Sequence, residues 1–388
     1  MIALPADLRA EREALRHLVL ATMMAWPQQE PAPAAIDALL LRLFRLQARA
    51  IAPYAKLCAA RGVVPDDVAD MTAIPLVPAA AFKYAPFSLS VSGDAAVRFD
   101  TSGTSDGQPG RIDLPDTAAY DLALQQTFAH FVVPDAAALH AVRPFRCLSL
   151  VPHKQARPYS SLGYMVRRLA QRWDDGNGGQ FLGNGADFSD GLDVAGVLAA
   201  CQRASRDAVP VLIFATTLAL DTLLQRWPVG TRLQLPTGSR LMDTGGPKGR
   251  RLEVSRAEQH QQLSDIFGLD PHLLVGELGM TELASQRYEA NLRRHFGLQA
   301  PDSDGYLPPT WLRASIRDVR TGQPCAPGET GLVAHLDLAN LDTCAFVLTA
   351  DLGHLDAAGG LHLHGRLPGS EWRGCGLDAE EITGVLRS

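Results

Sequence analysis

HLLVGELGMTE, residues 272–282, opens with apolar residues and then runs into glycine, threonine and glutamate. A short apolar run that ends at a turn signal is typical of a strand buried on both faces. The stretch SRLMDTGG, residues 239–246, repeats the pattern. Both segments therefore predict buried strands with polar and glycine residues gathered at their carboxyl ends.

Further segments predict the same alternation of strand and helix. FRCLSLVP (145–152) and VPVLIFATT (209–217) are apolar runs of strand length, and AEQHQQLSDIF (257–267) is amphipathic. Such alternation predicts an α/β fold with mainly parallel sheets and flanking helices. In parallel sheets ligands bind at the carboxyl ends of the strands, which is where the glycine- and threonine-rich stretches fall.

The two ends of the chain differ from this middle part. The first 80 residues favour helices, with an apolar stripe at Ile36, Leu39, Leu40, Leu43 and Phe44. Pro53 is expected to end or kink that helix, and residues 74–83 to form an extended linker. Beyond residue 306, the segments 329–338, 344–353 and 361–365 predict further strands joined by turns.

Composition excludes several classes of protein. The 388 residues are 46% hydrophobic, the formal net charge is −6, and no block of basic residues occurs, which argues against non-specific nucleic-acid binding. The sequence contains no run of 18 apolar residues, the length that a membrane span needs. The N-terminus does not match a secretory signal. The six cysteines are too scattered for a zinc site or a disulfide framework, so we expect reduced thiols and a cytoplasmic protein.

The stretch FDTSGTSDGQPGRI, residues 99–112, concentrates hydroxyl and glycine residues. Glycine lets backbone N–H groups approach a phosphate chain closely, and hydroxyls add donors without charge. The stretch therefore indicates a nucleotide phosphate cradle, although it lacks the lysine ending of a Walker loop. A polar hairpin turn is the alternative interpretation when the stretch is taken alone.

This loop resembles the phosphate loop of the adenylate-forming superfamily, whose members join a carboxylic acid to AMP. The matching residues, which the resemblance assigns to nucleotide binding, are Thr101, Ser102, Gly103, Thr104 and Ser105. Gly110 stands where the superfamily carries a lysine, so the resemblance leaves the cationic contact to Arg111.

Three further motifs follow in the superfamily's order. LGMTE (278–282) resembles its Tyr-Gly-x-Thr-Glu motif, which implies that Gly279 borders the substrate, Thr281 contacts phosphate and Glu282 holds Mg²⁺. Magnesium prefers one or two carboxylates together with phosphate oxygens, which agrees with that role. LTADLG (348–353) resembles the motif whose Asp, here Asp351, binds the ribose hydroxyls, and Arg366 matches an Arg that reaches the ribose.

Within the superfamily, the chain resembles the acyl-protein synthetases of bacterial luminescence from about residue 70 to about residue 380. LMDTGGPKGR (241–250) is similar to a stretch that places Gly245 and Gly246 beside the adenine, and His153 corresponds to a His of the acyl site. An Arg-Gly-Cys near the C-terminus of that family receives the acyl group, and Cys375 occupies its place. A thiol beside Arg373 and close to a predicted helix start should ionise readily. The alternative is that Cys375 is a small buried residue, like most free cysteines.

The resemblance implies an adenylation domain over residues 81–364, preceded by a helical region (1–80) and followed by a short mobile segment (365–388). It implies an acid–thiol ligase that uses ATP and Mg²⁺ to make acyl-AMP, transfers the acyl group to Cys375, and passes it to a reductase or acyl-carrier partner. The alternatives are an acid–coenzyme A or carrier-protein ligase with an external thiol, and a non-catalytic nucleotide-binding subunit. The sequence does not identify the acid or the oligomeric state.

Overall fold

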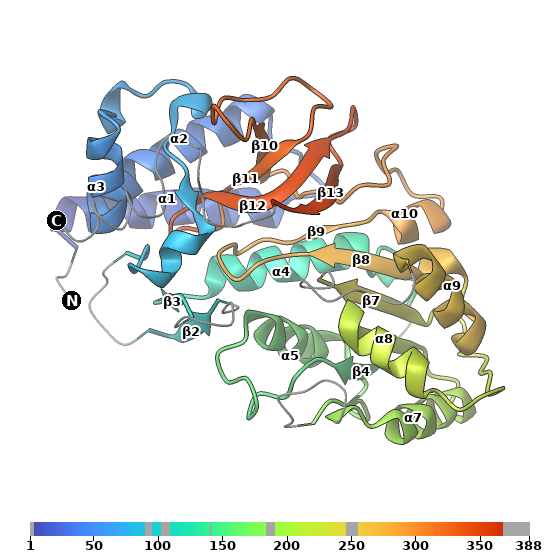
Figure 1. Ribbon diagram of the computed structural model, residues 1–388. Coiled ribbons are helices and arrows are strands. Elements are labelled where there is room, and N and C mark those ends of the chain that lie inside the picture. Colours follow the sequence, from blue (N-terminus) through green and yellow to red (C-terminus); the bar gives the residue numbers. More distant parts are fainter. Residues whose placement is uncertain are drawn as a thin grey trace. The chain divides into compact units, whose positions relative to one another are not determined.

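The computed structural model describes residues 4–89, 95–101, 109–139, 142–183, 191–245 and 255–367 (Figure 1). The chain divides into two compact units. Unit 1 comprises Met1–Gln126, Met280–Gln286 and Leu307–Ser388, and unit 2 comprises Thr127–Gly279 and Arg287–Tyr306. The chain therefore passes between the units several times, and unit 1 combines its first and last parts.

Unit 2 is built on a six-stranded sheet in the order β5-β4-β6-β7-β8-β9. The strands are β4 (Arg146–Leu150), β5 (Gly179–Gln180), β6 (Val211–Thr216), β7 (Arg240–Thr244), β8 (Leu274–Leu278) and β9 (Arg287–Tyr288). All neighbours pair in parallel except β8 and β9, which are antiparallel. The predicted α/β class with a mainly parallel sheet is confirmed, and the four long apolar runs form β4, β6, β7 and β8.

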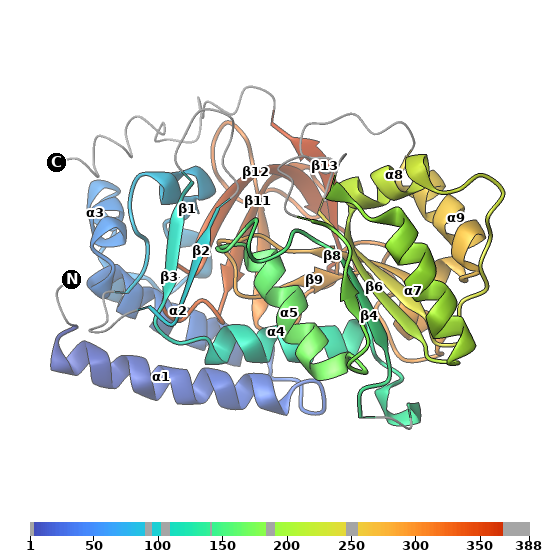
Figure 2. The same ribbon diagram turned by 90° about the horizontal axis from the view of Figure 1, so that it is seen from below.

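Helices cover both faces of this sheet (Figure 2). Helix α5 (Ser161–Trp173) lies on one face, and α7 (Val194–Arg206), α8 (Thr217–Arg226) and α9 (Arg256–Phe267) lie on the other. Alternate strand residues such as Leu148, Leu150 and Ile213 join the core beneath α7, α8 and α9. The period of two explains why the strands are apolar throughout: each face meets helices. The remaining elements of unit 2 are η4 (Ala136–Ala138), η5 (Pro271–Leu273) and α10 (Asn291–His295).

Local capping fixes where these helices begin. The side chains of Ser160, Asp193 and Thr216 accept hydrogen bonds from backbone N–H groups in the first turns of α5, α7 and α8. Ser255 and Glu258 form a reciprocal capping box at the start of α9. Each cap satisfies N–H groups that a helix N-terminus leaves without partners.

Unit 1 contains a five-stranded sheet in which β1-β12-β11-β10 are neighbours and β13 also pairs with β12. Its strands are β1 (Val77–Pro78), β10 (Leu312–Arg317), β11 (Gly331–Asp337), β12 (Phe346–Leu355) and β13 (Leu361–Arg366). All pairs are antiparallel except β1 with β12. The strands expected at 329–338, 344–353 and 361–365 correspond to β11, β12 and β13.

The segment at residues 74–83 differs from the extended linker that we expected. Val77 and Pro78 pair in parallel with Val347 and Leu348, and residues Ala79–Lys83 form the 3₁₀ helix η3. Leu76 and Val77 are buried, so the apolar side chains hold this segment in the sheet rather than in solvent.

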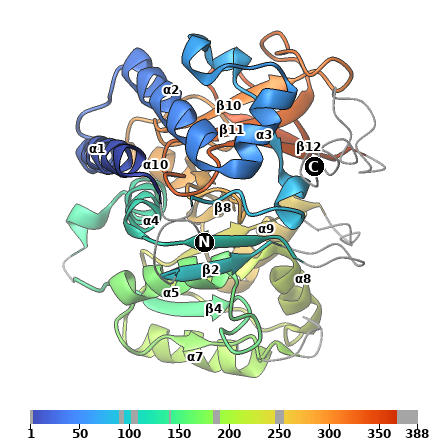
Figure 3. The same cartoon turned by 90° about the vertical axis from the view of Figure 1, so that its left-hand side faces the viewer.

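Helices from the start of the chain pack on the sheet of unit 1 (Figure 3). They are α1 (Ala6–Ala25), α2 (Pro33–Ala50) and α3 (Ala52–Ala60), followed by η1 (Pro65–Asp67) and η2 (Met71–Ala73). Phe44 of α2 and Tyr54 of α3 pack against Phe346 of β12, with ring centroids 5.8 and 6.2 Å away. Pro53 lies in the first turn of α3, so the prediction that it ends the preceding helix is confirmed.

Helix α4 (Ala118–Phe131) includes the boundary between the units. No helix of the described residues is long and apolar enough to cross a bilayer.

A buried ion pair fastens α1 to the rest of unit 1. Arg12 donates from Nε to one carboxylate oxygen of Asp342 at 2.6 Å and from Nη2 to the other at 2.8 Å. Both side chains are at most 8% exposed. Arg12 occupies a core position of α1, between Leu8 and Leu15, so it reaches Asp342 from the apolar face of the helix.

Replacing Arg12 with Met should strongly destabilise the protein, because Asp342 would keep a buried charge without its partner. We expect a loss of about 3–5 kcal/mol in the free energy of unfolding, measured by urea denaturation. Arg49→Met is the matched control, since the Arg49–Glu11 pair is 42% and 30% exposed and should contribute less than about 1 kcal/mol. Equal effects of the two substitutions would contradict the importance of the buried pair.

Candidate functional site

The described residues on both sides of the hydroxyl-rich stretch belong to a pair of strands in unit 1. Strands β2 (Val97–Asp100) and β3 (Arg111–Leu114) pair antiparallel. The next pair outward is Thr101 with Gly110: the Thr101 N–H donates to the Gly110 carbonyl at 2.8 Å, and the Gly110 N–H donates to Thr101 Oγ1 at 2.9 Å. These two bonds fix both ends of the loop that carries the expected phosphate-binding residues.

Gly110 has a steric reason to be glycine. A Cβ at this position would lie 2.8 Å from both the carbonyl carbon and the carbonyl oxygen of Phe82. A lysine, which the superfamily carries here, would therefore collide with backbone. Arg111 follows on β3, with its side chain 57% exposed and its Nε 2.6 Å from Asp113.

The segment that follows β8 is bound into unit 1 by two buried side chains. Asp337 accepts from the N–H groups of Ala284 and Ser285 at 3.0 and 2.8 Å and from Ser285 Oγ at 2.8 Å. Asn340 accepts from Ala284 N–H at 2.6 Å and donates to the Glu282 carbonyl at 2.7 Å. These contacts satisfy buried backbone groups on both sides of Leu283 and so fix the position of Glu282.

Glu282 is the centre of a small charge cluster in unit 1. Its side chain is nearly fully buried, and this burial raises its pKa to about 7. The charge of Asp351 also raises the pKa, whereas Arg366 and Lys83 lower it. Asp351 of β12 and Arg366 of β13 lie opposite each other in register and form an ion pair of 2.8 Å. The structure thus brings together three residues that the sequence motifs singled out separately.

A cleft in unit 1 runs past this glutamate. Its lining comes from β2, β3 and the start of α4 and from residues 281–284 and 339–343. The side chains that line it include Phe99, Ile112, Leu114, Tyr120, Thr281 and Glu282. Thr281, expected to contact phosphate, therefore shares this cleft with Glu282.

The residues present are suited to a magnesium ion held with a phosphate chain. Glu282 is a buried carboxyl whose ionisation is opposed by burial and by Asp351, and a divalent cation would favour its ionised form. Magnesium is commonly held by one or two carboxylates with substrate phosphates and water. Glu282 is the protein ligand that this arrangement offers.

The other described candidates lie in unit 2 at the carboxyl ends of parallel strands. Gly245 directly follows β7, Gly279 follows β8, and His153 comes three residues after β4. The His153 ring accepts a hydrogen bond through Nδ1 from the Gln155 N–H at 3.2 Å, so it lies in a local turn. Gly245 has φ +81°, and its carbonyl accepts a hydrogen bond from Thr217 Oγ1.

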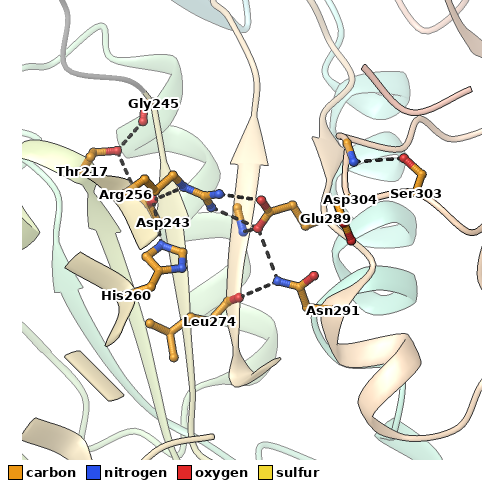
Figure 4. A network of polar contacts seen from close by, with 12 residues as sticks. Thr217, Asp243, Gly245, Arg256, His260, Leu274, Glu289, Asn291, Ser303 and Asp304 are labelled. Atoms are coloured by element: carbon orange, nitrogen blue, oxygen red, sulfur yellow. Dashed lines mark hydrogen bonds and ion pairs between the residues drawn. The ribbon is translucent and has the colours of Figure 1, made fainter. Parts of the chain in front are cut away.

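A polar network surrounds the end of β7 (Figure 4). Arg256, at the start of α9, contacts Asp243 of β7 at 3.1 Å and Glu289 at 2.5 and 3.0 Å. Asp243 also accepts from Thr217 Oγ1 at 2.8 Å and lies 3.3 Å from His260 Nε2. The network holds Gly245, which lies within the stretch 241–250, together with the first turn of α9.

Buried Glu277 of β8 lies beside this network. It accepts a hydrogen bond from Thr244 Oγ1. Burial raises its pKa to about 7, and the charge of Asp243 raises it further, against the opposing effect of the Thr244 bond. Glu277 therefore titrates near neutral pH inside the sheet.

Several predicted site residues lie outside the described part of the chain. They are Ser102, Gly103, Thr104, Ser105, Gly246 and Cys375. The five described cysteines are free thiols; all are buried except Cys325, which is partly exposed. The burial of the other four is typical of structural cysteines.

Sequence reasoning missed three residues that support the candidate site. Asn340 and Asp337 hold the Glu282 segment, and Lys83 acts on the Glu282 carboxyl. Polar residues inside the apolar stretch 331–348 were the available signal for the first two. Nothing in the sequence around Lys83 distinguishes it from an ordinary surface lysine.

The chain was compared with protein families, with curated proteins and with solved structures. No protein-family profile matches the chain. A long-chain-fatty-acid–luciferin-component ligase from Aliivibrio fischeri is 29% identical over 126 residues, which span 32% of this chain and 29% of that ligase. Over that stretch the chain is similar to a fatty-acid ligase.

The solved structures to which this chain is similar have lower sequence identity than that ligase. ATP-bound MatB from Rhodopseudomonas palustris has a TM-score of 0.46 at 17% identity, over 72% of this chain and 50% of its own. O-succinylbenzoate coenzyme A synthetase (MenE) from Bacillus subtilis, in complex with AMP, has a TM-score of 0.43 at 21% identity, over 70% and 49%. The luciferase-like enzyme of the mealworm Zophobas morio has a TM-score of 0.46 at 15% identity, over 72% and 59%. The chain thus matches about half the length of these structures.

Gly110→Ala should distort the base of the hairpin loop, because its Cβ would meet the Phe82 backbone, which cannot rotate away. We expect a loss of about 1–3 kcal/mol in the free energy of unfolding, measured by urea denaturation. Gly163→Ala in α5 is the control, since its nearest neighbour is the end of the flexible Arg167 side chain at 3.3 Å. That variant should be neutral or slightly stabilised. A neutral Gly110→Ala would contradict the steric argument.

Glu277 should make stability depend on pH. Its folded pKa of about 7 exceeds the ordinary value of 4.5, so the folded state binds more protons between these values. The free energy of unfolding should therefore fall as pH rises from about 4.5 to about 7, by ~3 kcal/mol from this residue. Glu277→Gln should remove that fall and be more stable than the parent protein at pH 8, measured by denaturation at both pH values. A similar gain from Glu11→Gln, at a partly exposed site, would show that the effect is not specific to Glu277.

Proposed function

We propose that this chain activates a carboxylic acid, fatty or aryl, with ATP and Mg²⁺ to form acyl-AMP, and then transfers the acyl group to its own Cys375 and on to a partner protein. The observation that carries the proposal is the cluster of Glu282, Asp351 and Arg366. Glu282 belongs to a motif about 70 residues before those of Asp351 and Arg366, and the resemblance assigns the three residues to the nucleotide and its Mg²⁺. Their convergence in unit 1 supports one shared ligand.

Each residue of the cluster has a chemical role in this proposal. Glu282 holds the magnesium ion, which when bound neutralises phosphate charge. Asp351 accepts hydrogen bonds from the ribose hydroxyls, and Arg366 lies beside it to contact the ribose. Thr101, Ser102, Gly103, Thr104 and Ser105 donate to the phosphates, with Arg111 as the nearby cation. Gly245 and Gly246 border the adenine, and His153 and Gly279 border the acid.

The reaction then has two steps. A carboxylate oxygen of the acid attacks the α-phosphorus of ATP, the bond between α-phosphorus and the bridging oxygen breaks, and pyrophosphate leaves. Donors directed at the phosphates stabilise the charge that develops in this step. The Cys375 thiolate next attacks the acyl carbon, a thioester forms, and AMP leaves.

The final acceptor is a partner protein in this proposal, such as a reductase or an acyl carrier. The similarity to a fatty-acid–luciferin-component ligase supports a fatty acid as the substrate class. Residues 365–388 act as the mobile segment that carries Cys375, and residues 81–364 as the adenylation domain. The second candidate function is a ligase that uses an external thiol. The third is a non-catalytic nucleotide-binding subunit, which is suggested by Gly110 in place of a lysine in the loop.

Glu282→Gln should abolish the nucleotide chemistry without unfolding the protein. We expect a loss of at least ~100-fold in acid-dependent exchange of pyrophosphate into ATP, since the metal ligand is removed. Glu258→Gln, at the exposed capping box of α9, is the control and should retain the exchange rate. Undiminished exchange in Glu282→Gln would exclude Glu282 as the magnesium ligand.

Exchange should also depend on pH in the parent protein. Because Mg²⁺ binds the ionised carboxyl, the rate at subsaturating Mg²⁺ should rise as pH passes through about 7, the pKa of Glu282. Saturating Mg²⁺ should move this rise to lower pH. Rate measurements across pH at two Mg²⁺ concentrations test this, and a profile unaffected by Mg²⁺ would oppose it.

Cys375→Ser separates the first two candidate functions. Under the proposal, the variant exchanges pyrophosphate normally but carries no thioester after incubation with labelled acid and ATP. Acylated protein that forms equally in the variant would favour a ligase with an external thiol. A parent protein with no acid-dependent exchange for any fatty or aryl acid would favour the non-catalytic subunit.

A further inference from the structure

Three histidines share one side of the hairpin formed by β12 and β13. His362 lies directly opposite His354 in the antiparallel register. His364 lies at an irregularity of the pairing, where the register shifts between Leu352 and Gly353. A bulge of this kind re-aims a side chain, and here the edge of the His364 ring meets the edge of the His354 ring.

The three rings are nearly parallel. The His354 ring lies 4.8 Å from the His362 ring and 4.9 Å from the His364 ring, with interplanar angles of 11° and 6°. His354 Nδ1 and His364 Nε2 are 2.7 Å apart and share a hydrogen bond. One of these two nitrogens must accept, so at least one of the rings is neutral.

A carboxylate orients the third ring. His362 Nε2 lies 2.8 Å from Asp356 Oδ2, while Asp356 Oδ1 accepts from the N–H groups of Ala358 and Gly360 in the turn between the strands. A carboxylate on one ring nitrogen fixes the tautomer and increases the basicity of the other, as it does for metal-bound histidines.

We propose that His354, His362 and His364 form a binding site for a late first-row divalent cation, with Zn²⁺ as its simplest occupant and Asp356 as the supporting carboxylate. This site does not include Glu282, the magnesium ligand of the proposed function, and the proposal does not depend on that function. Imidazole nitrogen is a ligand that suits zinc, copper and nickel, whereas magnesium prefers oxygen.

The pairing of β12 with β13 places the three histidines side by side, and rotation of their side chains must bring the nitrogens to one ion. Zn–N bonds are about 2.0–2.1 Å, so two nitrogens on one tetrahedral ion lie about 3.3 Å apart. His354 Nδ1 and His364 Nε2 are 2.7 Å apart, so their hydrogen bond must break and the two nitrogens move apart when an ion binds. As the side chains lie, no group of three His, Cys, Asp or Glu among the described residues could hold a metal ion, so the His362 ring must also turn about its side-chain bonds when the ion binds. All three rings are at least partly exposed, which permits this motion.

Calorimetric titration of the chelator-treated full-length protein with ZnCl₂ tests the site. We expect one ion per chain from this cluster, and His354→Ala should weaken it by roughly 100-fold or more because the central ligand is lost. Asp356→Asn keeps an oxygen for the turn and should weaken binding by roughly 10–100-fold. His17→Ala on α1, outside the cluster, is the matched control and should leave affinity unchanged.

Two further measurements distinguish coordination by these histidines from coordination by cysteine thiolates and from unfolding. Bound Co²⁺ should give the visible absorption of tetrahedral nitrogen coordination, without the thiolate charge-transfer bands that cysteine ligands produce. Circular dichroism checks that each variant is folded. The proposal is overturned if the parent protein binds no Zn²⁺, if binding survives unchanged in folded His354→Ala, or if Co²⁺ shows thiolate bands that persist in that variant.

Discussion

The candidate site depends on how the segment after β8 satisfies its buried backbone. Residues 280–286 belong to unit 1, where they form no regular strand or helix. Their polar groups therefore need side-chain partners, and Asp337 and Asn340 supply them. Asp337 is completely buried, and burial raises its pKa despite four hydrogen bonds. A buried carboxylate of this kind is stable only because each donor is in place.

This anchoring explains why Glu282 can remain nearly buried with a carboxyl that titrates near neutrality. The backbone on either side is held, so the side chain is directed to the group that contains Asp351, Arg366 and Lys83. The two carboxyls and two cations nearly balance, and small changes of charge should strongly alter Glu282 ionisation. A phosphate chain accompanied by a cation is a ligand suited to such an environment.

The sequence predicted the parts of the fold that depend on local apolar patterning. The runs that form β4, β6, β7 and β8 were readable because both faces of the sheet are covered and each strand is apolar throughout. The two residues of β1 were not readable, because their pairing with β12 depends on a partner about 270 residues away. Glu282, Asp351 and Arg366 were found through motifs, whereas Asn340 and Asp337 act through tertiary contacts that motifs do not encode. Arg12 could have been found, since a charged residue in an apolar helical stripe implies a buried partner.

The pairing of β1 with β12 has a consequence for how the chain can be divided. Residues 77 and 78 pair with Val347 and Leu348, along the part of the β12 edge that the pairing with β13 does not cover. A protein that began after residue 80 would present those amide and carbonyl groups, with buried apolar neighbours, as an open sheet edge. Open edges of this type recruit other chains. Strand β1 thus covers a sheet edge of unit 1, the same unit whose strands β12 and β13 carry Asp351 and Arg366.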